Sequence, residues 1–380
     1  MKLVTLKKEY NLLLKNTITE FLNPNYIYLK VTNNSRLKAN PKNYIYRGTQ
    51  LFDLISSPIS GKILGLKELN SVDGINKYMV IENDFKEKTK ERHGVRKNIN
   101  KIKKEELLEL LKTYDENIYS KFNSDYKKIM ISGVEEQPYI GTNIFICTNY
   151  TKEILDMCDA LGDILEINDV EILIKDIDVA SINSINNVIG MYNNVNVKFL
   201  PDKYMISDKE ILKEYLSIKE DFLYLDIEEI YNLYQYLKRR KIKEEKFITV
   251  TGDAIDNPQV IKCKTGTMLK DIIDNFLCFN TDEFVVIENS LLSKKEIDFN
   301  NYVISENLKG IYFMKKNDIK EEKCIMCGKC NEICPVKIKI SNLVNGKKCD
   351  IKNCINCGLC SYICPSYINI NKFLNGDKNE

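Results

Sequence analysis

The sequence predicts a multidomain protein that combines α+β and α/β units. At 380 residues the chain is longer than one hydrophobic core usually supports, so several domains are expected. Strand patterns alternate with amphipathic helices in the middle of the chain, which is typical of α/β architecture. A cysteine pattern occurs twice near the C-terminus. These observations divide the chain into units at residues 1–25, 26–85, 105–240, 245–312 and 318–380.

The overall charge is nearly balanced, with 56 Lys and Arg residues against 54 Asp and Glu residues. This balance predicts no nucleic-acid partner and no general attraction to anionic membranes. No stretch of about 18 apolar residues is present in the sequence, so no transmembrane segment is expected, although peripheral association with a membrane complex is compatible with it. The first residues lack the apolar core and cleavage site of a signal peptide, which predicts a cytoplasmic protein.

The two N-terminal units differ in their apolar patterns. Residues 1–25 carry apolar side chains at helical spacing before Pro24, and they predict a short N-terminal helix. Residues 26–85 show short alternating segments such as YIYLKV and KYMVIE, separated by Asn, Pro and Gly. This second unit is therefore predicted to be a small all-β module.

A charged linker over residues 86–104 precedes a segment in which strands and helices alternate. Predicted strands are KKIMIS, VEILIKD and VNVKFL, and the helices between them cover residues 151–165 and the region near 182–192. Further helices are predicted at 208–216 and 227–240. This order predicts a parallel sheet with the architecture of nucleotide-binding folds over residues 105–240. The next unit, 245–312, reads strand, Gly-Asp turn, strand, Gly-Thr turn and helix, which predicts a β-grasp.

Two cysteine runs, CIMCGKCNEICP and CINCGLCSYICP, lie thirty residues apart in an internal duplication. Their CxxCxxCxxxCP spacing is that of bacterial ferredoxins, in which each run supplies three ligands to one [4Fe-4S] cluster and its fourth cysteine to the other. Two [4Fe-4S] clusters are therefore predicted in residues 318–380. The expected ligand sets are Cys324, Cys327, Cys330 and Cys364 for one cluster and Cys354, Cys357, Cys360 and Cys334 for the other.

Two other uses of these cysteines fit the pattern less well. Structural zinc sites use CxxC pairs, often with histidine, and close with four ligands around one ion. Disulfides need an oxidising compartment, to which no N-terminal signal directs the chain. The role of Cys349, five residues before the second run, stays open, but it is not expected to be a ligand because the two runs already supply eight thiols.

Several segments resemble the C subunits of Rnf electron transport complexes. SSPISGKILGL at residues 56–66 resembles a segment of their barrel-sandwich hybrid module, and SGVEEQPYIG at 132–141 resembles their N-x-A-E-x-E-P-Y segment. The T-V-T-G-D-A, N-P and G-T pieces between residues 249 and 267 resemble their soluble-ligand-binding β-grasp (SLBB) domain. The resemblance implies a barrel-sandwich hybrid, an α/β domain like FMN- and NADH-binding domains, an SLBB domain and a ferredoxin-type domain, in that order.

Within the α/β segment, Gly133, Glu135, Pro138 and Tyr139 match the family pattern, and Gln137 replaces its second glutamate. The resemblance implies that Glu135 lies at a remnant of the nicotinamide and flavin site. The family's glycine-rich G-G-x-G-F-P-T loop is replaced here by YDENIYSKFNSDYKK. Backbone N–H groups hold a phosphate closely only where glycine leaves room, so binding of FMN or NADH is not expected.

Within this family the chain is most similar to proline-reductase-associated electron transfer proteins of anaerobes. The implied function is electron transfer through two [4Fe-4S] clusters, from a flavoprotein or ferredoxin donor to a terminal reductase such as proline reductase. One alternative is a complete flavin-dependent NADH oxidoreductase of the Rnf C-subunit or cobalamin reductase type. Another is a scaffold whose clusters are structural and whose other domains bind partners.

Overall fold

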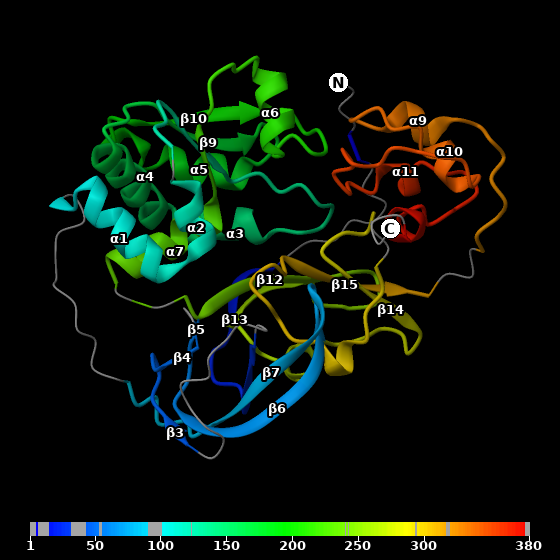
Figure 1. Ribbon diagram of the computed structural model, residues 1–380. Helices are drawn as coiled ribbons and strands as arrows, with labels where there is room; N and C mark the ends of the chain where they lie inside the picture. The colour runs from blue at the N-terminus through cyan, green and yellow to red at the C-terminus, as the bar shows by residue number, and fades with distance from the viewer. Residues whose placement is uncertain are drawn as a thin grey trace.

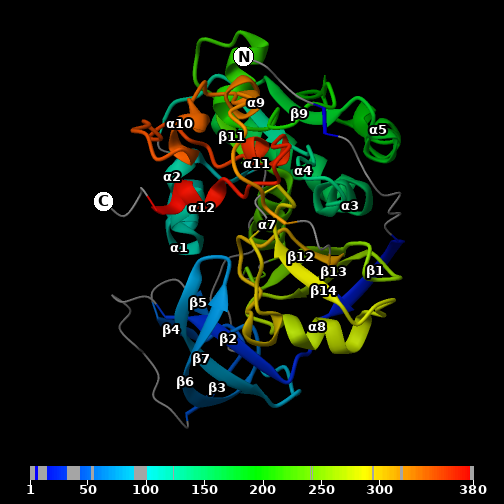
Figure 2. The same ribbon diagram turned by 90° about the vertical axis from the view of Figure 1, so that its right-hand side faces the viewer.

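The computed structural model describes residues 5–6, 15–31, 43–52, 55–89, 101–122, 124–239, 241, 243–292, 295–316 and 320–376. A five-stranded sheet occupies the centre of the molecule (Figure 1). The N-terminal β module lies below this sheet, whereas the α/β domain and the C-terminal domain lie side by side above it (Figure 2). Among the described residues, no helix is long and apolar enough to span a membrane.

The central sheet has the strand order β1-β13-β12-β15-β14. β12 and β13 pair antiparallel, as do β14 and β15, while β12 pairs parallel with β15. Helix α8 packs its apolar face on the sheet through Leu269, Ile272 and Ile273. Gly252, in the turn after β12, has a φ of 129°, and a Cβ there would overlap the Phe313 carbonyl. The bounds are β1 (Lys15–Phe21), β12 (Glu245–Thr251), β13 (Gln259–Lys264), α8 (Leu269–Phe276), β14 (Phe284–Glu288) and β15 (Gly310–Lys315).

The helix predicted for residues 1–25 is wrong over β1, which pairs parallel with the edge of β13. The rest of that prediction falls mainly outside the described residues. The aromatic ring of Phe21 contacts that of Phe276 on α8, with the centroids 5.6 Å apart. The β-branched residues Ile18 and Thr19 fit an extended backbone. Pairing with the open edge of β13 explains why this segment forms a strand rather than a helix.

The N-terminal β module is a four-stranded antiparallel sheet in the order β2-β7-β6-β3, with β4 and β5 as a separate pair. Its core contains Ile27, Ile63 and Ile81, each no more than 1% exposed. It joins the central sheet through a hydrogen bond from the Tyr28 N–H to the Gly266 carbonyl, at 2.8 Å. The bounds are β2 (Tyr26–Lys30), β3 (Tyr44–Ile45), β4 (Gln50–Phe52), β5 (Ile55–Ser56), β6 (Gly61–Ser71) and β7 (Gly74–Asn83).

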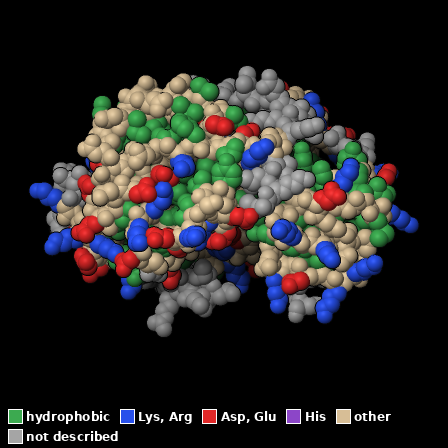
Figure 3. All heavy atoms as spheres, turned by 90° about the horizontal axis from the view of Figure 1, so that it is seen from above, with side chains coloured by type: hydrophobic (Ala, Val, Ile, Leu, Met, Phe, Trp, Pro, Cys, Tyr) green, Lys and Arg blue, Asp and Glu red, His purple; other side chains and the backbone are tan. Residues whose placement is uncertain are grey.

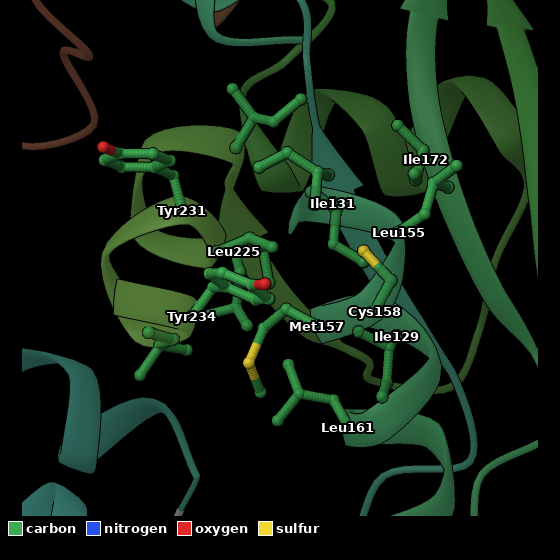
Figure 4. Packing of buried hydrophobic residues seen from close by; sticks show 14 of the residues in the cluster. Ile129, Ile131, Leu155, Met157, Cys158, Leu161, Ile172, Leu225, Tyr231 and Tyr234 are labelled. Atoms are coloured by element: carbon green, nitrogen blue, oxygen red, sulfur yellow. The ribbon is translucent and has the colours of Figure 1, made fainter. Parts of the chain in front are cut away.

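The α/β domain has the parallel sheet that the sequence predicts, in the order β10-β9-β8-β11. Ile154, Cys158 and Leu161 on α4 are buried against the sheet, as expected from their helical spacing. Figure 4 shows Cys158 and Leu161 beside Ile129 and Ile131 of β8. The bounds are β8 (Ile129–Ser132), α3 (Thr142–Asn149), α4 (Thr151–Leu165), β9 (Val170–Lys175), α5 (Val179–Asn186), β10 (Val195–Leu200), α6 (Lys209–Leu216), β11 (Leu223–Asp226) and α7 (Ile227–Leu237).

Helices α1 (Lys104–Tyr114) and α2 (Glu116–Lys121) precede this sheet. The sequence patterns did not predict these two helices. Leu107 and Leu111 of α1, four residues apart, are buried in the α/β core. The Asp115 carboxylate accepts hydrogen bonds from two N–H groups at the start of α2, at 2.9 and 3.1 Å. The stretch without glycine thus contains a capped helix rather than an open loop.

The C-terminal domain consists of short helices connected by the cysteine-containing loops. Its core brings apolar residues from both halves of the duplication together, including Ile338, Ile340, Ile368 and Ile370. The equivalent isoleucines of the two repeats thus pack in one small core. The bounds are α9 (Lys329–Ile333), α10 (Ile340–Val344), α11 (Leu359–Tyr362) and α12 (Asn371–Gly376).

A buried ion pair connects the α/β domain to the central sheet. The Lys246 Nζ on β12 lies 2.6 Å from a Glu228 carboxylate oxygen on α7, with side chains 6% and 9% exposed. Replacing Lys246 by Met leaves the carboxylate buried and unpaired, which should lower the free energy of unfolding by about 3–5 kcal/mol. Urea unfolding followed by circular dichroism measures this loss. The double variant Lys246→Met/Glu228→Leu should regain most of it, and an equally unstable double variant would contradict the prediction.

Candidate metal centre

The duplication in the cysteine-containing sequence is also a duplication of backbone conformation. Met326 and Asn356, thirty residues apart, have φ values of 56° and 51°, and Gly328 and Gly358 have 76° and 75°. Glycine adopts this left-handed conformation without the steric penalty of a Cβ, which explains its place before the third cysteine of each run. The two runs therefore present their thiols on closely similar loops.

Two pockets in this domain are lined by cysteines, four in each. Each pocket takes three cysteines from one run and the fourth from the other. Apolar side chains such as Val344 and Ile368 complete the first pocket, and Val336 and Leu374 complete the second. The cysteines are Cys324, Cys327, Cys330 and Cys364 in the first pocket and Cys334, Cys354, Cys357 and Cys360 in the second.

The thiols lie in surroundings suited to a cofactor that binds thiolates. Burial raises the pKa of Cys360 to about 12 and also raises the pKa of Cys330 and Cys357, so binding of a metal group must release protons. Backbone N–H groups point at two of the sulfurs, from Met326 to the Cys324 Sγ at 3.4 Å and from Ile338 to the Cys334 Sγ at 3.3 Å. Such donors stabilise negative charge on bound sulfur.

Neither pocket resembles a site for one metal ion. Within the described parts of the chain, no three His, Cys, Asp or Glu side chains converge closely enough to hold a single ion. Four thiols spread around an apolar pocket match an iron–sulfur cube, which occupies more space than one tetrahedral zinc ion. The donor set and the pocket lining therefore fit a [4Fe-4S] cluster in each place.

Cys349 lies apart from both sets of thiols. Its Sγ donates to the Lys339 carbonyl oxygen at 3.4 Å, and its side chain packs against the apolar core of the domain. It is absent from the described residues that line either pocket. Its position indicates a packing role.

Residues Gly133–Gly141, the GVEEQPYIG segment between β8 and α3, connect the parts of the molecule that surround the metal centre. The Gln137 amide donates to the Tyr204 hydroxyl at 3.0 Å, and this hydroxyl donates to the Cys357 carbonyl oxygen at 2.7 Å. On the other side, the Tyr312 hydroxyl of the central sheet donates to the Pro138 carbonyl oxygen at 2.9 Å. The segment thereby links the second cysteine run to both the α/β domain and the central sheet.

Glu135 is buried within this segment, with 9% of its surface exposed. One carboxylate oxygen accepts a hydrogen bond from the Asn143 N–H in the first turn of α3, at 3.1 Å, and the other has no partner among the described residues. Desolvation raises the pKa of Glu135 to about 7, although the nearby Lys309 charge and the Asn143 hydrogen bond act in the opposite direction. Glu135 therefore acts structurally as an acceptor at the start of α3.

An ion pair lies at the carboxyl end of β11, at the edge where open α/β sheets bind ligands. Asp226 ends β11 and caps α7, and its carboxylate lies 2.7 Å from the Lys309 Nζ. Burial favours a higher pKa for Asp226, but the charge and hydrogen bond of Lys309 outweigh it and lower the pKa. Lys309, the residue before β15, thus already pairs with the carboxylate at this edge.

The stretch that replaces the family's glycine-rich loop is part of the hydrophobic core. Ile118 and Phe122 are 2% and 4% exposed. The Lys121 ammonium lies 2.7 Å from the carboxylate oxygens of Glu229 on α7. Lys121 is thus already paired, and the backbone here is helical rather than open toward a phosphate.

Residues 315–365 match the family model described as a 4Fe-4S dicluster domain. The C subunit of the ion-translocating oxidoreductase complex of Buchnera aphidicola is 26% identical over 225 residues, which cover 55% of this chain and 47% of the relative. The C subunit of the Na(+)-translocating ferredoxin:NAD(+) oxidoreductase complex of Acetobacterium woodii is 23% identical over 228 residues, covering 57% and 52%. The chain is similar to these Rnf C subunits over somewhat more than half of its length. It spans about half the length of these two curated relatives.

The comparison with solved structures is weaker. An NAD+-reducing [NiFe]-hydrogenase in the air-oxidised state superposes with a TM-score of 0.42 at 10% identity, over 50% of this chain and 40% of that chain. A TM-score this low does not assign a common fold. The relationship to Rnf C subunits and the 4Fe-4S dicluster domain, by contrast, support electron transfer through iron–sulfur clusters.

The buried carboxyl of Glu135 gives a pH dependence that can be measured. Its pKa of about 7 in the folded chain exceeds the ordinary value of 4.5, so the folded state retains a proton that the unfolded state releases between these pH values. The stability contributed by Glu135 should therefore fall as pH rises through this window and level off above it, by on the order of 3 kcal/mol. Urea unfolding of the native chain and Glu135→Gln at pH 5, 6, 7 and 8 measures the difference. If the free energies of unfolding of the native chain and of Glu135→Gln differ by the same amount at every pH, Glu135 does not titrate this way.

Proposed function

We propose that this protein carries electrons through two [4Fe-4S] clusters between separate redox proteins. The observation that carries the proposal is the pair of four-cysteine pockets, each of which draws its fourth thiol from the opposite run. The first cluster would be held by Cys324, Cys327, Cys330 and Cys364, and the second by Cys334, Cys354, Cys357 and Cys360. When bound, such clusters accept and release single electrons at potentials set by their surroundings.

The chain supplies the surroundings that such a function needs. Apolar residues line both pockets and restrict water, and backbone N–H groups point at cysteine sulfurs. The name of the Acetobacterium woodii relative assigns that complex to electron exchange between ferredoxin and NAD(+). For this chain we propose a ferredoxin or a flavoprotein as the donor and a terminal reductase, such as proline reductase, as the acceptor.

A complete flavin-dependent NADH oxidoreductase is the second candidate, favoured by the name of the same relative. Against it stands helix α2, because its buried Ile118 and the buried Phe122 that follows the helix occupy the stretch that corresponds to the family's phosphate-binding loop. The chain offers no glycine between Thr113 and Ser132 to let a phosphate approach the backbone. Electrons would accordingly enter from another protein, and the clusters would be carriers rather than structural supports.

Iron content and single substitutions test the cluster assignment. Anaerobically reconstituted protein should contain about eight iron and eight sulfide per chain, because each pocket holds one cube. Cys364→Ser should reduce the iron content to about half and remove the paramagnetic resonance signal of the cluster at Cys324, Cys327 and Cys330. Cys349→Ser is the matched control and should retain the full iron content. Saturation of the native chain near four iron, or loss of a cluster in the control, contradicts the assignment.

Mixing experiments distinguish the two candidate functions. Purified protein with both clusters, supplemented with FMN, should show no rapid bleaching of cluster absorbance when NADH is added anaerobically, because residues 113–132 contain no glycine to let a phosphate approach the backbone. Dithionite added to the same sample should bleach the clusters and serves as the positive control. Rapid bleaching by NADH without another protein would establish the complete oxidoreductase instead.

A further inference from the structure

The duplication allows the two cysteine runs to be compared position by position, and their exposure differs. In the first run Cys327 is exposed, and Ile325 and Met326 are 65% and 66% exposed. In the second run, the corresponding Cys357 is partly buried and Ile355 is less exposed than Ile325. Because the backbone conformations match, the difference comes from what packs on the runs rather than from the loops themselves.

Other parts of the chain cover the second run. A Cβ placed on Gly358 would lie 2.7 Å from the Leu292 Cβ, whereas a Cβ on Gly328 would meet nothing within 4 Å. Tyr204 from the α/β domain hydrogen-bonds the Cys357 carbonyl and packs with Leu292 and Leu359. The turn at Cys357 and Gly358 thus lies against other parts of the molecule, while the turn at Cys327 and Gly328 faces outward.

The same comparison shows a difference in charge. Lys323 precedes the first cysteine of the first run and Lys329 lies between its second and third cysteines, where the second run has Asn353 and Leu359. The exposed Glu322 and Glu332 of the first run stand where the second run has Lys352 and Tyr362. Lys323 and Lys329 are exposed, and neither has an ion-pair partner in the described part of the chain. Residues 320–376 contain nine lysines against four acidic residues, and lysine side chains spread over the right-hand lobe in Figure 3.

These observations define a surface, the first-run face, formed by Lys323, Ile325, Met326, Cys327 and Lys329. We propose that the first-run face is the docking site for a redox protein with an acidic surface. This inference rests on the proposed electron-transfer function. Electron exchange slows steeply with distance, so a partner exchanges electrons fastest at the cluster whose ligand is exposed. The lysines attract and orient an acidic partner, and the two apolar side chains give it a small dry contact.

The acidic partner fits this face better than an anionic membrane does. The apolar part consists of two neighbouring side chains on a short loop, without the amphipathic helix that usually enters a lipid interface. The negative charge of bound clusters lies inside the domain, while the lysine ammonium groups stand at its surface. One electron leaves the partner and one arrives on the chain, so the exchange needs no other reactant.

Charge reversal at the first-run face tests the docking site. The probe is a purified acidic ferredoxin, with basic cytochrome c as the probe of opposite charge. The variant is Lys323→Glu/Lys329→Glu, and the control is Lys67→Glu on β6, an exposed lysine of the distant β module. Complex formation is measured by isothermal titration calorimetry and electron exchange by stopped-flow absorbance, each at low and high salt.

The double variant should bind the ferredoxin about tenfold more weakly and exchange electrons about tenfold more slowly at low salt, with less dependence on salt. The control should behave like the native chain, and cytochrome c should not be slowed by the double variant. Equal rates for variant and native chain overturn the docking site, as does an equal loss in the control. The native chain is also tested with anionic vesicles. If it sediments with them in a salt-sensitive way, and the double variant loses this sedimentation while its electron exchange with ferredoxin is unchanged, the face binds a membrane.

Cluster content and reduction by dithionite are measured on each sample first. A chain that holds no reducible cluster refutes the proposed function itself. If the chain holds two reducible clusters but the charge reversals leave the rate of electron exchange unchanged, only the docking site is refuted.

Discussion

The packing of residues Gly133–Gly141 is the constraint on which the relative positions of the domains depend. The segment leaves β8 at the carboxyl edge of the parallel sheet and leads into α3, and on the way its side chains contact the central sheet and the loop that carries Tyr204. Ile140 packs so closely on the central sheet that a Cβ at Gly310 would overlap it. The Glu136 carboxylate accepts hydrogen bonds from the Met205 and Ser207 N–H groups, which holds the loop that carries Tyr204. In open α/β folds this edge commonly faces a ligand, but here it organises protein contacts.

Those contacts place the two duplicated cysteine loops in different surroundings. The duplication provides both runs with the same turns and the same spacing of thiols. Tyr204 and Leu292 pack on the turn at Cys357 and Gly358, whereas the turn at Cys327 and Gly328 stays open, and the substitutions between the repeats follow this difference. A buried leucine, Leu359, stands where the first run has the exposed Lys329. Because potentials depend on solvent exposure and on hydrogen bonds near sulfur, the two environments would give bound clusters different potentials from nearly identical ligand loops.

The sequence was informative where local periodicity was strong. Helix α4 and strand β10 have the predicted bounds, since a 15-residue segment with one apolar face specifies a helix and the alternation in VNVKFL specifies a strand. β1 was missed because its pairing with β13 joins positions about 240 residues apart, and no local pattern reveals such an edge. Helices α1 and α2 were missed because residues 105–113 received no assignment and YDENIYSKFNSDYKK was interpreted as the replacement of a loop, although Leu107 and Leu111 carry a helical signal. The cover on the second run, from Tyr204 and Leu292, likewise arises only from tertiary contacts.

The same tertiary contacts engage backbone groups at the edge where proteins with parallel nucleotide-fold topology commonly bind phosphate. A phosphate site requires backbone N–H groups that are exposed and free of other acceptors. At the start of α3, Glu135 already accepts the Asn143 N–H and the Thr249 hydroxyl accepts the Gly141 N–H. At the start of α7, Asp226 caps the helix and pairs with Lys309. The N-termini of α3 and α7 at this edge are thus engaged by contacts within the protein, and the loop between β10 and α6 at the same edge positions Tyr204 against the cysteine-bearing domain.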